Sequence, residues 1–334
     1  MTNPLLARPN DRDDTMARLL ADALGDRVAF TPELGWLVWD RWRWRVDAGD
    51  VRVRGVVADW LRPLILDAVD WLDRNGANGA AISAMTRGLQ VKVQADWIKA
   101  LQPLVLVEVE DWDAYPHLLN TPTGVVDLRD GTLLPHDPAL RLTLGTSVGY
   151  VAGATHPDWE RALQCQPQDD DRAWLQARLG SGCWGHQRED SLALLTGHGS
   201  NGKSTVMSGV RAALGDYASL TDRSVIVGKG HEAHKARLRG RRLVLVEELD
   251  DGHRLNMAEV KGLLGTESVS GRHLYKEAME FTPQFTLVVT TNYKPQVPDT
   301  DHGTWRRLVR LDFGVRYEGA EKDAGLRRRC RTGK

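Results

Sequence analysis

The spacing of apolar and polar residues divides the chain near residue 188. Before that point, short apolar stretches alternate with turn residues, and the pattern predicts both strands and helices. The elements expected there are a β-hairpin at 34–47, a helix at 57–72, two short strands within 123–138 and two short helices at 156–166 and 169–180. The first part of the chain is therefore expected to be a mixed α/β region.

After residue 188, short apolar runs alternate regularly with helical segments. The expected strands are 192–196, 224–227, 243–247, 285–290 and 308–313, and the expected helices are 203–214 and 256–264. Strands that alternate with helices are typical of a largely parallel sheet covered by helices. The pattern thus predicts an α/β fold for the second part.

Residues 41–45 read RWRWR, and this stretch has two interpretations. Basic residues between aromatic ones suit single-stranded nucleic acid. The alternation also places Trp42 and Trp44 on one face of a strand, with the arginines opposite. We favour the second interpretation, in which both tryptophans lie in a core.

A glycine-rich loop follows the first strand of the second part. Gly197, Gly202, Lys203 and Ser204 satisfy G-x-x-x-x-G-K-[ST] between a predicted strand and a predicted helix. Glycines let the backbone turn its N–H groups towards phosphate oxygens, and the start of a helix adds partial positive charge. Lys203 is expected to reach the β- and γ-phosphates, and the Ser204 hydroxyl to ligate Mg²⁺. The residues expected to bind the nucleotide are Gly197, Gly199, Asn201, Gly202, Lys203, Ser204 and Thr205.

Two acids end the apolar run at 243–247. One of Glu247 and Glu248 can hold the hydrated Mg²⁺, and the other can orient the attacking water. The plainer alternative is a charged strand end. Asp250 and Asp251 are interpreted as a solvated turn.

Polar residues also flank the last two predicted strands. Asn292 follows one of them, where an amide would lie beside the γ-phosphate as a sensor. Arg306 and Arg307 precede the other, where an arginine finger would be presented. Taken alone, Asn292 would be a turn residue and the two arginines would form surface ion pairs. The sensor and finger roles are favoured because these residues follow the loop and the acids in this order.

A hairpin is predicted at 268–281. It would carry Arg272, His273, Tyr275 and Lys276, and cations beside aromatic rings suit the phosphates and bases of single-stranded nucleic acid. An ordinary solvated hairpin is the alternative if the stretch is taken alone.

The motifs, taken in order, resemble those of superfamily 3 helicases. They read GHGSNGKST, RLVLVEELDDG, LNMAEVKGLLGTESVSGRHLYKEAMEFTPQF, TTNYKP and GTWRRLVRLDF. The chain is most similar to the phage- and plasmid-encoded primase-helicases related to the poxvirus enzyme. Upstream, GVVDLRDGTLLPHDP and GYVAGATHPDW resemble the conserved amino-terminal domain of those proteins. The resemblance covers residues 116–317, and residues 1–115 match only loosely.

This resemblance implies an AAA+ type P-loop NTPase that forms hexameric rings and moves along one DNA strand. It assigns the acidic role and Mg²⁺ binding to Glu248, with Glu247 beside it, and the sensor role to Asn292. It places Arg307, or as second choice Arg306, in the site of a neighbouring subunit. The hairpin, with Lys276 near its tip, would track DNA in the central pore.

The expected domains follow from the resemblance and the change of pattern. They are a Trp-rich region without an assigned function at 1–115, a helicase-associated amino-terminal domain at 116–188, the AAA+ domain at 189–317 and a basic tail at 318–334. Residues 1–115 lack the acidic and histidine residues of a primase site, so primer synthesis is not expected. The family usually continues into a further helical segment, so we expect a truncated carboxyl terminus.

Composition excludes several classes of protein. No apolar run approaches the ~20 residues of a membrane span, so no membrane partner is expected. Three cysteines are too few and too scattered for a disulfide framework or a zinc site, which favours the cytoplasm of a bacterial host. The net charge of −1 argues against coating of DNA along its length, but allows a local basic groove.

The predicted function is an ATP-dependent DNA helicase of a phage, prophage or plasmid. It would use ATP and Mg²⁺, act on single-stranded or forked DNA, and work with a separate primase or replication initiator. An AAA+ DNA-binding switch or loader without processive unwinding is the alternative. A small-molecule P-loop kinase is less favoured, because no lid or acceptor-substrate motif is visible.

Overall fold

The computed structural model describes residues 3–6, 13–186, 189–228, 232–265, 268–272, 278–298, 301–319 and 322–332, with the backbone alone at 278 and 279. The chain forms two compact units. The first contains Met1–Ala114 and His136–Thr143, and the second contains Tyr115–Pro135 and Leu144–Lys334. The segments predicted as separate domains at 116–188 and 189–317 therefore share the second unit, apart from 136–143.

The first unit combines four helices and a small antiparallel sheet in its described part. Its elements are α1 (Asp13–Leu24), β1 (Val28–Thr31), β2 (Gly35–Trp39), β3 (Trp44–Val46), α2 (Val51–Arg74), α3 (Gly79–Thr86) and α4 (Val91–Leu101). In α2, the fully buried Val53, Val57, Leu61 and Ile65 recur every four residues and join one core with residues of α1 and α4. The predicted helix at 57–72 is thus confirmed and is longer at both ends.

The expected hairpin at 34–47 is present as β2 and β3, but Trp42 and Trp44 of the RWRWR stretch do not share a core face. Residues 41–43 form a bend in which Arg41 has a φ of 82°. Of these two, Trp44 is buried, and its Nε1 donates to the Pro138 carbonyl at 2.9 Å. Trp42 is half-buried, 4.4 Å from the Arg43 guanidinium carbon. The core interpretation therefore holds for Trp44 alone, because the bend breaks the strand alternation.

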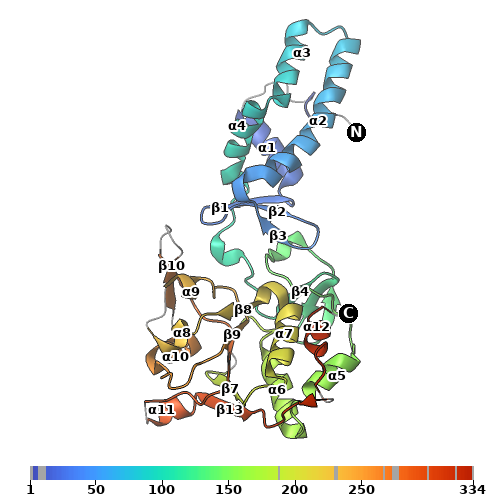
Figure 1. The fold of residues 1–334 in the computed structure, drawn as a ribbon. Coiled ribbons are helices and arrows are strands. Elements are labelled where there is room, and N and C mark those ends of the chain that lie inside the picture. Colours follow the sequence, from blue (N-terminus) through green and yellow to red (C-terminus); the bar gives the residue numbers. More distant parts are fainter. Residues whose placement is uncertain are drawn as a thin grey trace. The chain divides into compact units, whose positions relative to one another are not determined.

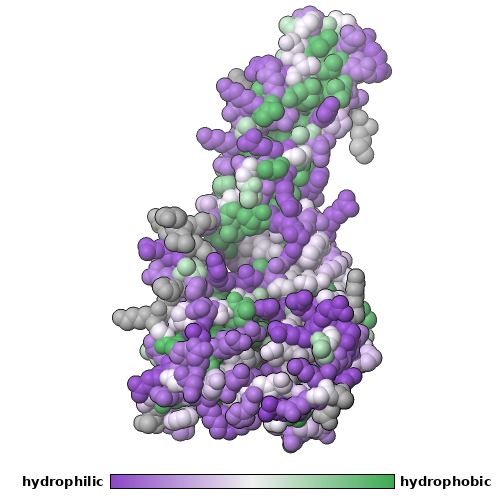
Figure 2. All heavy atoms as spheres, in the orientation of Figure 1, coloured by the Kyte–Doolittle hydropathy of each residue, from purple (hydrophilic) through white to green (hydrophobic). Residues whose placement is uncertain are grey.

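The helical part of the first unit also carries apolar surface. Figure 2 shows hydrophobic residues gathered over this region between hydrophilic ones. The large apolar side chains exposed there include Leu66, Trp71, Leu89 and Val91. No helix in the described part of the chain is both long and apolar enough to cross a membrane.

The second unit is built on a five-stranded parallel sheet. Its strands are β7 (Leu192–Thr196), β8 (Ala218–Thr221), β9 (Leu243–Glu247), β12 (Thr286–Thr291) and β13 (Leu308–Asp312). They lie side by side in the order β13-β7-β12-β9-β8, and every neighbouring pair is parallel. The predicted parallel sheet is confirmed.

Both faces of this sheet are buried, as a parallel sheet requires. Ala193 and Leu195 of β7 enter one core, while Leu192 and Leu194 enter the core on the opposite face. Helices cover the two faces (Figure 1). One core includes residues of α5 (Pro157–Leu163), α6 (Asp169–Ser181) and α7 (Lys203–Leu214), and the other includes residues of α8 (Ser224–Val227) and α10 (Met257–Leu264).

The remaining elements surround these layers. They are the antiparallel strands β4 (Leu118–Thr121), β5 (Gly124–Asp127) and β6 (Thr132–Leu134), the hairpin strands β10 (Val269–Arg272) and β11 (Ala278–Phe281), and the short helices α9 (Glu232–Ala236), α11 (His302–Trp305) and α12 (Leu326–Thr332). The expected strands within 123–138 and the expected helices at 156–166 and 169–180 are present.

The strand predicted at 224–227 is wrong, because these residues form α8. A short apolar run does not by itself distinguish a strand from a turn of helix. The Asp222 carboxylate accepts from the Ser224 N–H at 2.8 Å at the start of this turn, and Val225 and Ile226 are fully buried in the core that contains α10. The neighbouring edge strand, β8, was not predicted.

Candidate nucleotide-binding site

The glycine-rich loop begins where the buried strand β7 ends. Gly199, Ser200 and Gly202 have φ values of 89°, 48° and 85°, in the left-handed region that glycine adopts most easily. A Cβ at Gly202 would lie 2.6 Å from the Cβ of Cys165, so a larger residue does not fit there. The Gly202 carbonyl accepts from the Thr205 N–H at 3.0 Å, which starts α7 directly after the loop.

Lys203 is buried at the start of α7 and makes three contacts through its ammonium group. The Nζ atom lies 2.8 Å from the Gly197 carbonyl oxygen, 3.1 Å from Asn201 Oδ1 and 3.4 Å from Asn292 Oδ1. Burial lowers the pKa of this lysine below its usual value. The three acceptors are all neutral, so the ammonium group would gain from an exchange of one of them for an anionic oxygen.

The loop and the start of α7 line a cavity of about 810 Å³. Ser204 is exposed in it, and Thr205 is half-buried. The predicted nucleotide-binding residues that line the cavity are Gly199, Asn201, Gly202, Lys203, Ser204 and Thr205, and Asn292 joins them. Gly197 contacts Lys203 from the end of β7. The cavity thus combines a lysine, an exposed hydroxyl and the first N–H groups of a helix, which together suit a phosphate group and Mg²⁺.

Parallel pairing brings the other predicted residues to the same edge of the sheet. Thr291 of β12 is in register with Thr196 of β7, and Thr290 is in register with Glu247 of β9. Asn292 directly follows β12, which lies between the other two strands. The carboxyl ends of three strands therefore carry the loop, the amide and the acids.

The two acids differ in their surroundings. Glu247 ends β9 and is half-buried, whereas Glu248 is exposed with a φ of 61°. The Glu248 N–H donates to the Thr290 carbonyl at 2.9 Å, and Arg223 Nη1 donates to the Glu248 carbonyl at 3.3 Å. These bonds hold the backbone turn after β9. Neither acid is among the described residues that line the cavity.

The two predicted finger arginines lie away from the cavity. Arg307 Nη2 is 3.1 Å from an Asp190 carboxylate oxygen, and its Nη1 donates to the Gly303 carbonyl at 2.8 Å. Arg306 Nη2 is 3.6 Å from the same Asp190 oxygen, and its side chain is more exposed than that of Arg307. Neither arginine is among the described lining residues. The loop and these arginines do not meet within the chain.

The predicted hairpin is present as the antiparallel pair β10 and β11. Arg272 is exposed at its outer end, with Nε 3.4 Å from a Glu232 carboxylate oxygen. His273, Tyr275 and Lys276 lie outside the described residues. Of the predicted DNA-binding side chains, the structure thus places only Arg272.

Sequence reasoning missed the acid that ends β13. The Thr196 hydroxyl donates to the Asp312 carboxylate, and Arg310 Nη2 donates to it at 2.7 Å. The Thr196 hydrogen bond is the main reason that the pKa of Asp312 is lowered. Both residues end strands that pair in parallel, so the bond joins β13 to the residue just before the loop. In the sequence, the position of Asp312 at the end of a predicted strand is the signal that could have indicated its role.

Sequence reasoning also missed the far wall of the cavity. Its described residues are Arg161 and Ala162 of α5, Gln164 and Pro167 after that helix, and Val315, Tyr317, Lys322, Asp323, Ala324, Leu326 and Arg327, the last two at the start of α12. The predicted basic tail at 318–334 is in its described part a docked segment, since Leu326 and Cys330 pack against the core around α7. Only the tertiary structure brings this segment to the cavity beside the loop, where the Tyr317 N–H donates to the Ser200 carbonyl at 2.9 Å.

One arginine holds α12 in place. The Arg329 guanidinium donates to the Asp158 carboxylate at 2.9 and 3.0 Å and to the Asp323 carboxylate at 2.7 and 3.3 Å. These bonds lower the pKa of Asp323 to about 2 and also lower that of Asp158. Arg161 Nη1 is 3.5 Å from Asp323. The network ties α12 to α5, which forms another part of the cavity wall.

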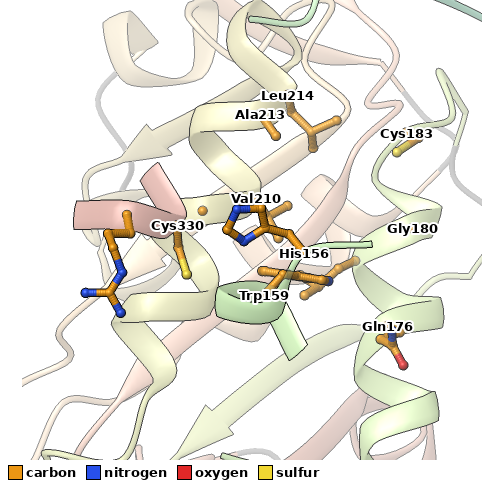
Figure 3. A pocket seen from close by; sticks show the side chains of 12 residues that line it. His156, Trp159, Gln176, Gly180, Cys183, Val210, Ala213, Leu214 and Cys330 are labelled. Carbon is orange, nitrogen blue, oxygen red and sulfur yellow. The ribbon is translucent and has the colours of Figure 1, made fainter. Parts of the chain in front are cut away.

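A second cavity, of about 510 Å³, borders α5, α6, α7 and α12. Figure 3 shows Trp159, His156 and Val210 near its centre, with Cys330 on one side and Cys183 on the other. Burial raises the pKa of both thiols. The lining is mainly apolar, so this cavity does not offer the phosphate-binding groups of the first.

Comparison with known proteins places these features in a family. The model for D5 N terminal like domains matches residues 17–166, and the model of a family of unknown function, DUF5906, matches residues 195–307. The chain is 30% identical over 222 residues to the putative primase C962R of African swine fever virus and 28% identical over 211 residues to the putative helicase L207/L206 of Acanthamoeba polyphaga mimivirus. It is 26% identical over 234 residues to the uncoating factor OPG117 of vaccinia virus.

These matches support the D5-like primase-helicase family for this chain. The D5-like match extends upstream to residue 17, whereas the sequence resemblance covered only residues from 116. The second match spans the glycine-rich loop, the two acids, the hairpin, Asn292 and both arginines.

The alignments cover 63%, 60% and 64% of this D5-like chain, but only 23%, 22% and 30% of the three relatives. The chain thus corresponds to about a quarter of the length of these curated proteins. The fold is similar to the C-terminal region (305–718) of NrS-1, with a TM-score of 0.56, 10% identity, and coverage of 97% of this chain and 68% of that one. This similarity supports the mixed α/β fold of the D5-like chain.

Proposed function

We propose that this chain is the ATP-hydrolysing part of a DNA helicase that acts in the replication of a phage, prophage or plasmid. The observation that carries the proposal is the contact between Lys203 and Asn292, at 3.4 Å, inside a glycine-lined cavity. A lysine at the start of a helix and an amide at the end of the neighbouring strand would both face the terminal phosphate of ATP.

The sheet order supports an AAA+ type of P-loop NTPase. The strand that carries Asn292 lies between the loop strand β7 and the acidic strand β9. This interposed strand is the arrangement expected of the AAA+ fold that the family resemblance implies. It leaves room beside the loop for an amide that senses the nucleotide and an acid that acts on it.

Each residue has a proposed task in hydrolysis. Lys203 would exchange its longest contact, to Asn292, for phosphate oxygens, since an anionic acceptor binds an ammonium group more strongly than a neutral amide. Bound Mg²⁺ would neutralise charge on the β- and γ-phosphate oxygens. Ser204 and Glu248 would hold that ion, and Glu247 would orient water. Asn292, released by Lys203, would donate its amide N–H to the γ-phosphate.

The arginines and the hairpin extend the proposal beyond one subunit. Arg307, or Arg306 in its place, would reach the cavity of a neighbouring copy in a closed ring, here proposed as a hexamer. The hairpin β10–β11 would contact single-stranded DNA in the centre of that ring, with Arg272 on its described part. A separate primase or initiator would deliver the DNA.

Strand displacement on a forked DNA tests the proposal, with ATP hydrolysis measured in the same samples. We compare the wild-type chain with Lys203→Ala, which removes the ammonium group in the cavity. Lys99→Ala is the matched control, because Lys99 is an exposed lysine of α4 in the first unit. We expect hydrolysis and displacement in the wild type and the control, and neither in Lys203→Ala.

Two results would count against the proposal. Equal hydrolysis by Lys203→Ala and the wild type would remove the nucleotide assignment. Hydrolysis by the wild type without displacement of any strand would instead favour an AAA+ switch or loader.

A further inference from the structure

The cavity that contains the glycine-rich loop has cations on both walls. Lys203 lies on the loop side, and Arg161, Lys322 and Arg327 lie on the opposite wall, with Asp323 as the one carboxylate among the described lining residues. Asp323 is engaged by Arg161 and by Arg329. The far wall is therefore positively charged, although it lies outside the sequence motif for phosphate binding.

Arg327 differs from Arg161, the other arginine of that wall, in being unpaired among the described residues. Arg161 is paired with Asp323, whereas the exposed guanidinium of Arg327 has no hydrogen-bond or ion-pair partner within the described part of the chain. Its backbone is held in α12, where Leu326 and Cys330 pack against the core and Arg329 binds two carboxylates. A fixed backbone with an unengaged guanidinium is an arrangement that suits capture of an anion.

The helix separates Arg327 from its neighbour. Side chains one residue apart in a helix are rotated by about 100°, so Arg327 lies beside the docked face and Arg328 lies roughly opposite Leu326. Arg327 lines the cavity, and Arg328 is exposed without being among its described lining residues. The two arginines share charge, helix and exposure, and differ in what they face.

We propose that Arg327 is a second phosphate-binding cation of the nucleotide site, supplied by the same subunit as the loop. This inference rests on the proposed binding of ATP. The planar guanidinium can donate two parallel N–H bonds to a phosphate group, which a lysine cannot do. Through α12, the carboxyl-terminal segment then becomes a wall that closes on the nucleotide instead of a tail beside it.

Nucleotide binding to the full chain tests the role of Arg327. The dissociation constants of ATP, ADP and adenosine are measured by calorimetry for the wild type, Arg327→Gln, Arg327→Lys, Arg328→Gln and Lys203→Ala. Loss of a charge-assisted hydrogen bond weakens binding by about tenfold or more. We expect that loss for ATP and ADP in Arg327→Gln, a partial return in Arg327→Lys, and wild-type affinity in Arg328→Gln. Adenosine has no phosphate, so its affinity should not change.

The outcomes separate this inference from the proposal on which it rests. If the wild type binds ATP and Lys203→Ala does not, but Arg327→Gln binds like the wild type, the role of Arg327 is refuted and the nucleotide site stands. Equal weakening in Arg327→Gln and Arg328→Gln also refutes it, because a general loss of positive charge would then explain the effect. If the wild type binds no nucleotide, both are refuted.

Discussion

Asn292→Asp tests the geometry of the cavity with a change of charge and almost no change of shape. The substitution would place a carboxylate oxygen 3.4 Å from Lys203 Nζ, where an amide oxygen now lies. At an effective dielectric constant of about 20, the attraction between two unit charges at this distance is about 5 kcal/mol. Desolvation of the new carboxylate offsets most of it, and the net gain of a charged over a neutral acceptor is about 1–1.5 kcal/mol.

ATP must overcome this gain, because Lys203 would have to leave a carboxylate for the phosphate. A difference of ~1.4 kcal/mol is tenfold in affinity, and repulsion between the carboxylate and the γ-phosphate adds to it. We therefore expect ATP to bind at least about tenfold more weakly to Asn292→Asp than to the wild type. ADP lacks the γ-phosphate and should lose less. Asn292→Ala removes both the acceptor that competes for Lys203 and the amide that would donate to the γ-phosphate, so it should bind ATP more tightly than Asn292→Asp.

Calorimetric titration with ATP and ADP measures these differences. Asn75→Asp is the matched control, since Asn75 is exposed at the end of α2 and the change adds the same charge. ATP affinity in Asn292→Asp equal to that of the wild type would refute the placement of Asn292 beside the terminal phosphate. A loss as large in Asn75→Asp would show that net charge alone is responsible.

Three further predictions concern the acid, the ring and the carboxyl-terminal anchor. Glu247→Gln should bind ATP normally but hydrolyse it about 100-fold more slowly, as for loss of a group that orients water only in the chemical step; equal loss of binding and turnover would contradict this role. Arg307→Ala should be nearly inactive, since an arginine finger is worth ~10³–10⁵ in rate, and Lys203→Ala should be nearly inactive because it lacks the loop lysine. Mixing the two variants should restore part of the ATP hydrolysis. Co-assembly shown by size analysis without recovery of hydrolysis would exclude Arg307 as the finger. Arg329 lowers the pKa of Asp323 to about 2, so this pair stabilises the fold above about pH 4, and the contribution is lost as the pH falls towards 2. The melting temperature of Arg329→Met should thus be lower than that of the wild type at pH 6 and approach it near pH 2. A difference in melting temperature that does not change with pH would contradict the prediction.

Local patterns along the chain were sufficient for most of the second unit. The G-x-x-x-x-G-K-[ST] loop, the strands at 192–196 and 243–247 and the helix at 203–214 could be predicted because glycine conformation, strand burial and helix spacing are properties of adjacent residues. The order of the motifs was also enough to indicate the family. Where two structures suit the same short run, as at 224–227, the sequence alone was ambiguous, and packing against α10 decided for helix.

The tertiary structure decided which distant residues meet. Asn292 could be predicted to follow a strand, but its contact with Lys203 depends on the insertion of β12 between β7 and β9. The bond between Thr196 and Asp312 likewise depends on the pairing of β13 with β7. The segment predicted as a basic tail became a wall of the cavity beside the glycine-rich loop, because Arg329 binds the carboxylate of Asp158 on α5 and that of Asp323 just before α12. The Lys203–Asn292, Thr196–Asp312 and Asp158–Arg329 contacts join residues 89, 116 and 171 positions apart, and only the folded chain, in which burial and charge pairing across elements are satisfied together, determines them.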